Sequence, residues 1–247
     1  MPGAPDTRSR DAAPFCERAA RTEVKHPVDK ARIRFHKGGA LRLLSHHDLM
    51  RTFERLLRRS ELPFHRSQGF HPKPRLVFAL SLPLGVVGRE EVVELELDEL
   101  LSPEEIQARL SRQAPPGLEI LSVRRIPVKV NAQVRRLAYA VPVPAERLPD
   151  LSRRIADLLS ARECWIDRHR PNSRQADRKI DVRPLLVDLS IHPPRGPSQA
   201  AMLEMVLRLT TTGTARPEEV LGLLGLEDLL DAGAVLERSR LELKDEG

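Results

Sequence analysis

Between residues 31 and 126 the hydrophobic pattern of the chain switches repeatedly between a period of two and helical spacing. Alternation predicts strands near residues 31–35, 76–82, 92–97 and 118–126, and helical spacing predicts helices after Ser45 and Ser102. This strand-helix-strand-strand-helix-strand order matches the split βαβ, ferredoxin-like sandwich. We therefore expect an α+β fold with two helices on one face of an antiparallel sheet and the other face free for a partner or a second domain.

The first predicted helix is amphipathic and has a basic outer side. Ser45 and Asp48 resemble a capping box, because a Ser at the N-cap is followed three residues later by an acid. Apolar residues follow at helical spacing, and the opposite side carries Arg51, Arg55, Arg58 and Arg59.

The remainder of the chain repeats the α+β theme less regularly. We expect strands near 137–143, 164–166, 180–191, 201–209 and 235–243, helices near 148–159 and 217–224, and a basic turn at 168–179. Residues 1–29 are rich in Pro, Ala and charge without periodicity, which predicts a disordered extension. The expected domains are therefore a ferredoxin-like α+β domain at 30–128 and a second α+β domain at 129–247.

Composition removes several classes of protein. Cys16 and Cys164 are the only cysteines, too few to ligate an iron–sulfur cluster in this chain, and they favour a reducing cytoplasm over disulfide-based secretion. No apolar run approaches the length of a membrane span, and the N-terminus does not resemble a signal peptide. Only eight residues are aromatic, which argues against a base-stacking platform.

The net charge of +6 conceals an uneven distribution. Residues 21–75 hold fourteen Lys or Arg against five acids, and residues 124–183 hold fifteen against seven. Residues 76–123 hold three against nine. The basic blocks favour a phosphate backbone or another polyanion as a partner, whereas the alternative is that they are solvated helix faces with surface ion pairs.

Five of the eight histidines lie between residues 36 and 71, in the densest group of polar residues. They could bind a metal, although no pair has HxxxH or HxH spacing. His46 could act as general base in RNA cleavage or modification. Phosphate could be bound at the helix N-terminus. The remaining alternative is a capped helix with ordinary polar surface. The candidate binding residues of this region are His36, Lys37, Ser45, His46, Asp48, Gln68, His71, Lys73 and Arg75, and no metal site is assigned.

A second group of candidates starts a later predicted strand. Lys179, Asp181 and Arg183 alternate, so they project from one strand face beside the predicted basic turn. They could form the second half of a binding surface, or Asp181 could simply pair with its basic neighbours. Motifs of nucleophilic catalysis, of the phosphate-binding P-loop and of dinucleotide binding are missing from the sequence.

Three stretches resemble the radical SAM-linked protein family, a bacterial domain family of unknown function that is fused to radical SAM proteins or encoded beside them. The stretches are Arg34-Phe35-His36-Lys37-Gly38-Gly39, Leu41-Arg42-Leu43-Leu44-Ser45-His46-His47-Asp48 and Ser67-Gln68-Gly69-Phe70-His71-Pro72-Lys73-Pro74. The resemblance continues through Leu84-Gly85-Val86 and Lys179 to Pro184. His47 and His71 depart from the family, where apolar residues and Asn are common.

The resemblance implies an accessory or substrate-recognition protein for a radical SAM enzyme on a separate chain. The present sequence lacks the CxxxCxxC motif, so S-adenosylmethionine and the iron–sulfur cluster are expected on that partner and no cofactor on this chain. RNA, with tRNA as one candidate, suits the basic blocks. Two alternatives stay open: an RNA-processing or RNA-modifying enzyme with His46 as general base, and a protein-interaction scaffold without nucleic acid. All three place the protein in the cytoplasm, without a membrane.

Overall fold

The computed structural model describes residues 27–68, 70–168, 178–194, 196 and 200–246. Most of the predicted N-terminal extension and most of the predicted basic turn, residues 169–177, lie outside this part of the chain. In the described residues none of the helices is long and apolar enough to cross a membrane.

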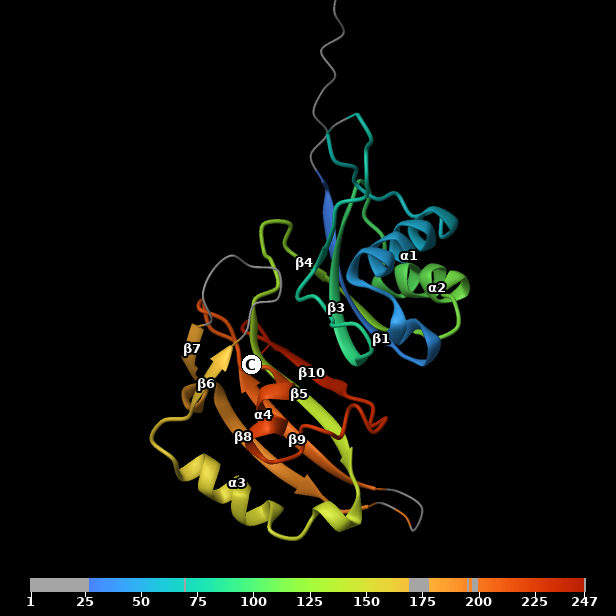
Figure 1. The fold of residues 1–247 in the computed structure, drawn as a ribbon. Coiled ribbons are helices and arrows are strands. Elements are labelled where there is room, and N and C mark those ends of the chain that lie inside the picture. The colour runs from blue at the N-terminus through green and yellow to red at the C-terminus, as the bar shows by residue number, and fades with distance from the viewer. Residues whose placement is uncertain (1–26, 69, 169–177, 195, 197–199, 247) are drawn as a thin grey trace, which may run out of the picture.

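Most strands of the described residues belong to one mixed sheet with the order β4-β1-β3-β10-β5-β9-β8, and β2 pairs with β3 beside this path (Figure 1). A separate pair of strands forms β6-β7. The strands are β1 Asp29–Lys37, β2 Leu76–Phe78, β3 Val87–Leu97, β4 Leu118–Ile126, β5 Val134–Val143, β6 Trp165–Arg168, β7 Arg178–Asp181, β8 Leu186–His192, β9 Ala201–Arg208 and β10 Glu237–Leu243.

The α-helices of the described residues are α1 His46–Arg59, α2 Pro103–Gln113, α3 Leu151–Ser160 and α4 Pro217–Leu223. Short 3-10 turns occur at Gly39–Leu43, Ala145–Arg147 and Arg183–Leu185. Both predicted helix starts of the first half are confirmed, because the hydroxyls of Ser45 and Ser102 accept from the backbone N–H of Asp48 (3.2 Å) and Glu105 (3.1 Å).

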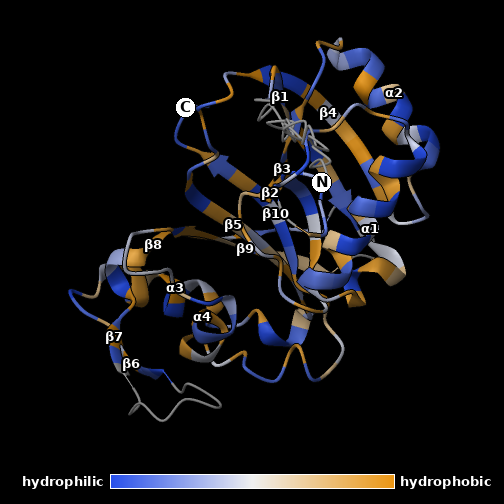
Figure 2. Cartoon of the chain, turned by 90° about the horizontal axis from the view of Figure 1, so that it is seen from above, coloured by the Kyte–Doolittle hydropathy of each residue, from blue (hydrophilic) through white to orange (hydrophobic). Residues whose placement is uncertain are grey.

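The first half packs α1 and α2 on the same face of β1, β3 and β4 (Figure 1). β1 is antiparallel to both β3 and β4, and β2 is antiparallel to β3. Ile33, Phe35 and Phe53 are fully buried in the core between the layers. Figure 2 shows the mixed hydrophobic and hydrophilic residues of both helices, which the amphipathic pattern predicts.

The second half adds β5, β8, β9 and β10 with α3 and α4, around a separate hydrophobic core. β10 lies between β5 and β3, antiparallel to β5 and parallel to β3 at Glu237 and Arg238. The predicted domain boundary near residue 129 therefore falls between strands of one continuous sheet. The α+β class predicted from the sequence is confirmed.

Two predicted strands are shorter than the hydrophobic pattern indicates. The expected strand 180–191 is interrupted, because Val182 adopts helical angles and Pro184 lies in a 3-10 turn that separates β7 from β8. The expected strand 76–82 is regular only at Leu76–Phe78. The chain then leaves the sheet edge, and the carbonyl of Ser81 accepts from the buried Arg238 at 3.1 Å.

The sheet face opposite α1 and α2 is covered by segments of the predicted second domain, one of the two occupants expected from the sequence. Lys30, Arg32 and Glu94 lie on it and are almost completely buried. The segment at Val130 and Asn131 crosses it and accepts hydrogen bonds from Lys30, and the C-terminal segment contacts Arg32 through Asp245. These two segments, which the strand pattern does not reveal, cover the polar side of β1.

Candidate functional site

Helix α1 presents a row of cations because its apolar side is used by the core. Leu49, Phe53, Leu56 and Leu57 are buried against the sheet. The remaining positions turn Arg51, Arg55, Arg58 and Arg59 to solvent, and all four are exposed. The sequence prediction of a basic outer face on this helix is confirmed.

Residues 65–75 form a hairpin that extends from the end of β3. Ser67 N–H donates to Lys73 O (2.8 Å), Arg75 N–H donates to His65 O (2.8 Å), and Arg66 and Pro74 form a β-bridge. The base of the hairpin is joined to β3, since Glu96 accepts from His65 N–H and donates to Arg75 O. These bonds hold both arms in place, so the exposed residues between them are presented on a fixed support.

The tip of the 65–75 hairpin is fully open to solvent. Gln68, His71 and Lys73 are exposed, and Phe70 has a relative exposure of 103%. A large apolar ring that is this open to water offers a contact to a partner. The signal in the sequence is an aromatic residue next to Gly69 between two stretches that pair with one another.

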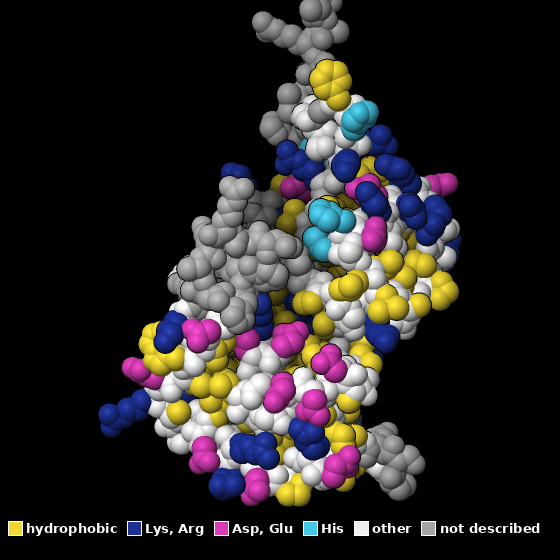
Figure 3. All heavy atoms as spheres, viewed as in Figure 1, with side chains coloured by type: hydrophobic (Ala, Val, Ile, Leu, Met, Phe, Trp, Pro, Cys, Tyr) yellow, Lys and Arg dark blue, Asp and Glu magenta, His cyan; other side chains and the backbone are white. Residues whose placement is uncertain are grey.

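The hairpin and α1 together form what we call the basic surface, defined by Arg51, Arg55, Arg58, Arg59, Arg66, Lys73 and Arg75. All seven side chains are exposed. Lys73 Nζ lies 4.0 Å from a Glu54 carboxylate oxygen on α1, which places the hairpin beside the helix. Figure 3 shows Lys and Arg side chains gathered over this end of the molecule, with His side chains among them and most of the visible acids on the other half.

Few of these cations are neutralised by strong ion pairs. Arg51 lies 3.4 Å from Asp48, Arg75 lies 3.5 Å from Glu96, and Lys73 has the 4.0 Å contact with Glu54. Arg55, Arg58, Arg59 and Arg66 take part in none of the ion pairs found among the described residues. The basic surface therefore keeps a positive field in solution.

His46 lies at the edge of the basic surface, at the first position of α1. Its ring packs edge-on against Phe78, with ring centroids 5.3 Å apart. Burial lowers the pKa of His46, and the nearby charges of His47 and Lys37 lower it further. Its Nδ1 is buried without a hydrogen-bond partner among the described residues. His46 is therefore neutral at pH 7 and has one unused ring nitrogen.

Lys37, a predicted binding residue, is fully buried and serves the fold. Its ammonium group donates to the carbonyl of Leu44 at 3.0 Å and lies 3.5 Å from that of Arg42, so it holds the turn that leads into α1. Burial lowers the pKa of Lys37, while the charge of Glu91 opposes this shift and that of Arg238 adds to it. The turn that Lys37 supports positions Ser45 and His46.

His36 is half-buried, and its ring lies over the next glycine. A Cβ on Gly38 would lie 2.4 Å from His36 Nε2, so Gly38 makes room for the imidazole. Ser45 and Asp48 close the start of α1, since the Ser45 hydroxyl also donates to the Asp48 carboxylate at 2.7 Å. The structure thus brings Lys37, Ser45, His46 and Asp48 together around the start of α1, and it places His36 against Gly38.

The later candidates lie elsewhere. Asp181 ends β7 and accepts from the backbone N–H groups of Cys164 (2.7 Å) and Arg183 (3.0 Å). Arg183 donates to the carbonyls of Leu186 (3.2 Å) and Leu159. Lys179 is exposed on β7. Figures 1 and 2 both show β7 on the far side of the molecule from α1. The structure does not bring these three residues to the basic surface. It uses Asp181 and Arg183 to join the segment between α3 and β6 to the turn after β7.

The described residues contain no group of three or more His, Cys, Asp or Glu side chains that could hold a metal ion. The five histidines of the first half are thus distributed among different contacts. His65 Nδ1 lies 2.6 Å from Asp98, and His71 is exposed at the hairpin tip.

Comparison with known proteins gives one family, together with solved structures that are only distantly similar. The family model described as "Uncharacterized protein conserved in bacteria (DUF2344)" matches residues 30–217. No curated protein matches the chain. One similar structure is a chain of the crystal structure of a Cbf5-Nop10-Gar1 complex, which is 11% identical and gives a TM-score of 0.46. The match covers 85% of the present chain and 48% of the Cbf5-Nop10-Gar1 chain, so the present chain spans about half the length of that chain. An unknown protein from Galdieria sulphuraria is 13% identical with a TM-score of 0.25, over 87% of this chain and 98% of that one. Neither likeness supports an argument about function.

Proposed function

The chain belongs to this bacterial family, and we propose that it is a non-catalytic accessory protein that binds RNA for a radical SAM enzyme on a separate chain. The observation that carries the RNA part is the basic surface, which has seven exposed cations on α1 and the 65–75 hairpin. Four of them are in no ion pair of the described residues. The radical SAM part rests on the sequence motifs around His36, Ser45 and Gln68.

We also infer a ferredoxin-like fold for residues 30–128. The strand order β4-β1-β3-β2, with every neighbouring pair antiparallel, supports this, and so do the two helices on one face. In such a fold α1 and the loop after it lie on the outside of the molecule, where a long partner can reach them. The basic surface therefore belongs to the first half, and the second half is free to meet a protein partner.

The composition of the basic surface favours recognition of phosphates and shape over recognition of base sequence. Arg guanidinium groups bind phosphate oxygens through paired hydrogen bonds, and several of them together release counterions from RNA. Phe70 is the only fully exposed ring among the described residues, so it can stack on one base at most. Phosphate contacts then supply most of the binding free energy, and tRNA or another structured RNA fits this mode.

The RNA part is tested by charge reversal on α1. Binding is measured by fluorescence anisotropy with labelled bulk tRNA. R55E/R58E should weaken binding, and the slope of log K against log salt concentration should become less negative by about 1.4 to 1.8, because two phosphate contacts are lost. The matched control, R153E/R162E, makes the same change of charge at exposed positions of α3 and the turn after it. Equal binding by the two variants would show that the basic surface is not the RNA site.

The partner is tested separately. The tagged full chain should capture a radical SAM protein after cross-linking in bacterial cells, identified by mass spectrometry, and RNA should be recovered in the same fraction. Capture of RNA without any radical SAM protein contradicts the accessory role and leaves an RNA-binding protein. Capture of the enzyme without RNA favours the protein-interaction scaffold.

The lowered pKa of His46, a residue that is only partly buried, favours one second candidate, an RNA-processing or RNA-modifying enzyme in which this imidazole is the general base. The fully buried Lys37 would not touch substrate in such an enzyme, because its ammonium is used by backbone carbonyls. An RNA that the intact chain cleaves or modifies should not be turned over by the His46→Gln variant. Unchanged turnover in this variant would end the enzymatic alternative.

A further inference from the structure

The sheet face opposite α1 and α2 carries a second group of cations, unrelated to the basic surface. Along β1 the residues Lys30, Arg32 and Arg34 alternate with the core residues and so share this face. Arg32 is paired across the sheet with Arg124 on β4 and with Glu94 on β3. Two arginines directly opposite one another repel, so this face needs anionic partners.

The strands supply too few carboxylates for these cations. Glu94 is shared, with contacts of 2.7 Å to Lys30 and 2.9 Å to Arg32. Arg34 lies 3.7 Å from Glu90, whose side chain is half exposed. Lys30 is further satisfied by the carbonyl of Val130 and the amide oxygen of Asn131, both at 2.7 Å. A positive surplus therefore remains on Arg32, Arg34 and Arg124, which we call the guanidinium face.

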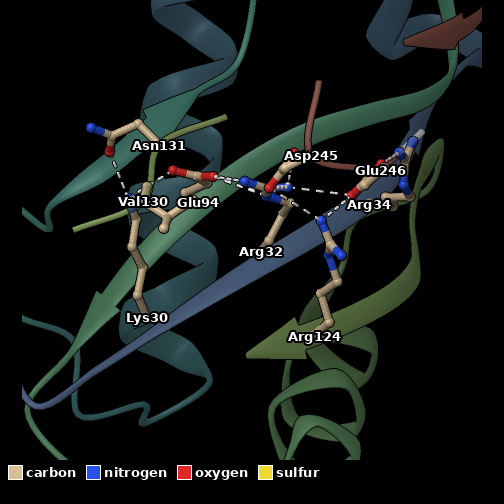
Figure 4. A network of polar contacts seen from close by, with 9 residues as sticks. All are labelled: Lys30, Arg32, Arg34, Glu94, Arg124, Val130, Asn131, Asp245 and Glu246. Carbon is tan, nitrogen blue, oxygen red and sulfur yellow. Dashed lines mark hydrogen bonds and ion pairs between the residues drawn. The ribbon is translucent and has the colours of Figure 1, made fainter. Parts of the chain in front are cut away.

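The C-terminal segment brings the missing acids. Arg32 Nη1 donates to both carboxylate oxygens of Asp245, at 2.9 and 2.8 Å. Glu246 pairs with Arg34 and with Arg124 (Figure 4). Arg32 is thereby 1% exposed, whereas Asp245 above it is 39% exposed. The two acids lie on the solvent side of the arginines, where an external polyanion would lie.

We propose that the guanidinium face is a second site for the phosphate backbone of RNA, which the Asp245–Glu246 segment occupies in competition with RNA. The class of partner rests on the proposed function. Guanidinium groups bind phosphate and carboxylate oxygens with the same paired geometry, so one kind of ligand can replace the other.

A polyanion is the ligand that the competition favours. The C-terminal segment is tethered, so its acids act at an effective concentration of roughly millimolar. A free ligand with only two carboxylates would not displace it at lower concentrations. RNA offers many phosphates and gains free energy from counterion release. Burial alone would raise the pKa of Asp245. The hydrogen bonds and the charge of Arg32, a backbone hydrogen bond and the charge of Arg124 together lower this pKa below its ordinary value, so the acid stays ionised at neutral pH.

The test removes the two acids from the full chain. Binding of a labelled single-stranded oligouridine is measured by anisotropy titrations. In D245N/E246Q the slope of log K against log salt concentration should become more negative by about two, because the three arginines of the guanidinium face become available for phosphate contacts. The matched control, E99Q/E104Q, removes the same charge at exposed positions that take part in none of the ion pairs of the described residues. Should the double variant not fold, E246Q alone should steepen the slope by about one, because it releases Arg34 and Arg124 only in part.

A second pair of substitutions ties the gain to the arginines. R34A/R124A, added to D245N/E246Q, should reverse about 1.4 of this change in slope and leave about 0.7, which belongs to Arg32. The proposal is overturned if D245N/E246Q and E99Q/E104Q bind alike, or if the unmasked variant gains affinity for polyglutamate and not for oligouridine. The change of slope in D245N/E246Q is measured relative to the intact chain. R55E/R58E tests the basic surface separately, so a failure of the proposed function is distinguishable from a failure of the guanidinium face.

Discussion

Arg238 on β10 and Glu91 on β3 form an almost completely buried ion pair where the two halves of the sheet meet. Arg238 Nε donates to Glu91 Oε1 at 2.7 Å, and a second contact joins Nη2 to Oε2. Their side chains are 1% and 3% exposed. Because β10 is in ladder register with β3 only at Glu237 and Arg238, this ion pair is a principal connection between the halves.

Breaking this pair should destabilise the whole sheet. Glu91→Gln leaves the guanidinium of Arg238 buried with half its partner, which costs about 3 to 5 kcal/mol. Urea denaturation, followed by circular dichroism, measures this loss. Glu237→Gln is the control, because it breaks the exposed pair with Arg89 (2.7 Å) on the same strands and should cost about 1 kcal/mol or less. Equal costs for the two variants would contradict the importance of the buried pair.

Much of the local structure of the first half can be predicted from the sequence. Ser45 and Ser102 mark helix starts because their hydroxyls cap orphan N–H groups, and the alternation from Ala31 to Phe35 marks the central strand. The union of the halves could not be predicted in this way, because it depends on residues about 150 positions apart, such as Glu91 and Arg238, whose pairing leaves no local pattern.

The protonation of His46 should make stability depend on pH. Burial, with the charges of His47 and Lys37, lowers the pKa of His46 in the folded chain, so the unfolded chain binds a proton first as the pH falls. The free energy of unfolding should therefore decrease as the pH falls through about 6.5, the ordinary value of histidine. Urea denaturation between about pH 7.5 and pH 5 measures this slope.

His46→Gln should remove part of that slope, because glutamine does not titrate. His71→Gln is the matched control, since His71 is exposed on the 65–75 hairpin and should leave the slope nearly unchanged. A His46→Gln variant with the full pH dependence of the intact chain would contradict the burial of this ring.

Gly117 is required by a close approach of two backbone segments. It has φ +87°, and a Cβ there would lie 2.6 Å from the carbonyl oxygen of Gly38, whose N–H donates to Gly117 O at 2.8 Å. Gly117→Ala should cost more than about 1 kcal/mol, since strain and a clash combine. Gly222→Ala is the contrast, because a Cβ there meets open space in α4 and should stabilise by about 0.5 to 1 kcal/mol. Thermal unfolding of both variants gives the comparison.

The candidate site was predictable where it depends on periodicity and not where it depends on what a polar side chain contacts. The arginines of α1 follow from the helical pattern. In the sequence Lys37 has the character of a ligand-binding residue, but its ammonium group donates to backbone carbonyls. Asp181 likewise accepts from backbone N–H groups. A sequence does not distinguish a polar residue that awaits a ligand from one that braces a turn, because both contacts are made by the same chemical groups.

Phe70 should matter for binding and not for folding. Its ring is fully exposed at the hairpin tip, so Phe70→Ala should change the free energy of unfolding by no more than about 0.5 kcal/mol. If the ring stacks on one base of a bound RNA, its loss should cost about 1 to 3 kcal/mol of binding. The salt slope should stay the same, because no phosphate contact is lost, and this separates Phe70→Ala from R55E/R58E.

Anisotropy titrations with a labelled single-stranded RNA at several salt concentrations test this expectation. Leu100→Ala is the matched control, because it truncates another exposed apolar side chain, 60% exposed, that is not part of the basic surface. Binding that is equal in Phe70→Ala and Leu100→Ala would remove the hairpin tip from the RNA interface. Weaker binding in Phe70→Ala alone would place the RNA across the hairpin as well as along α1, because only a strand that passes over the tip can reach this ring.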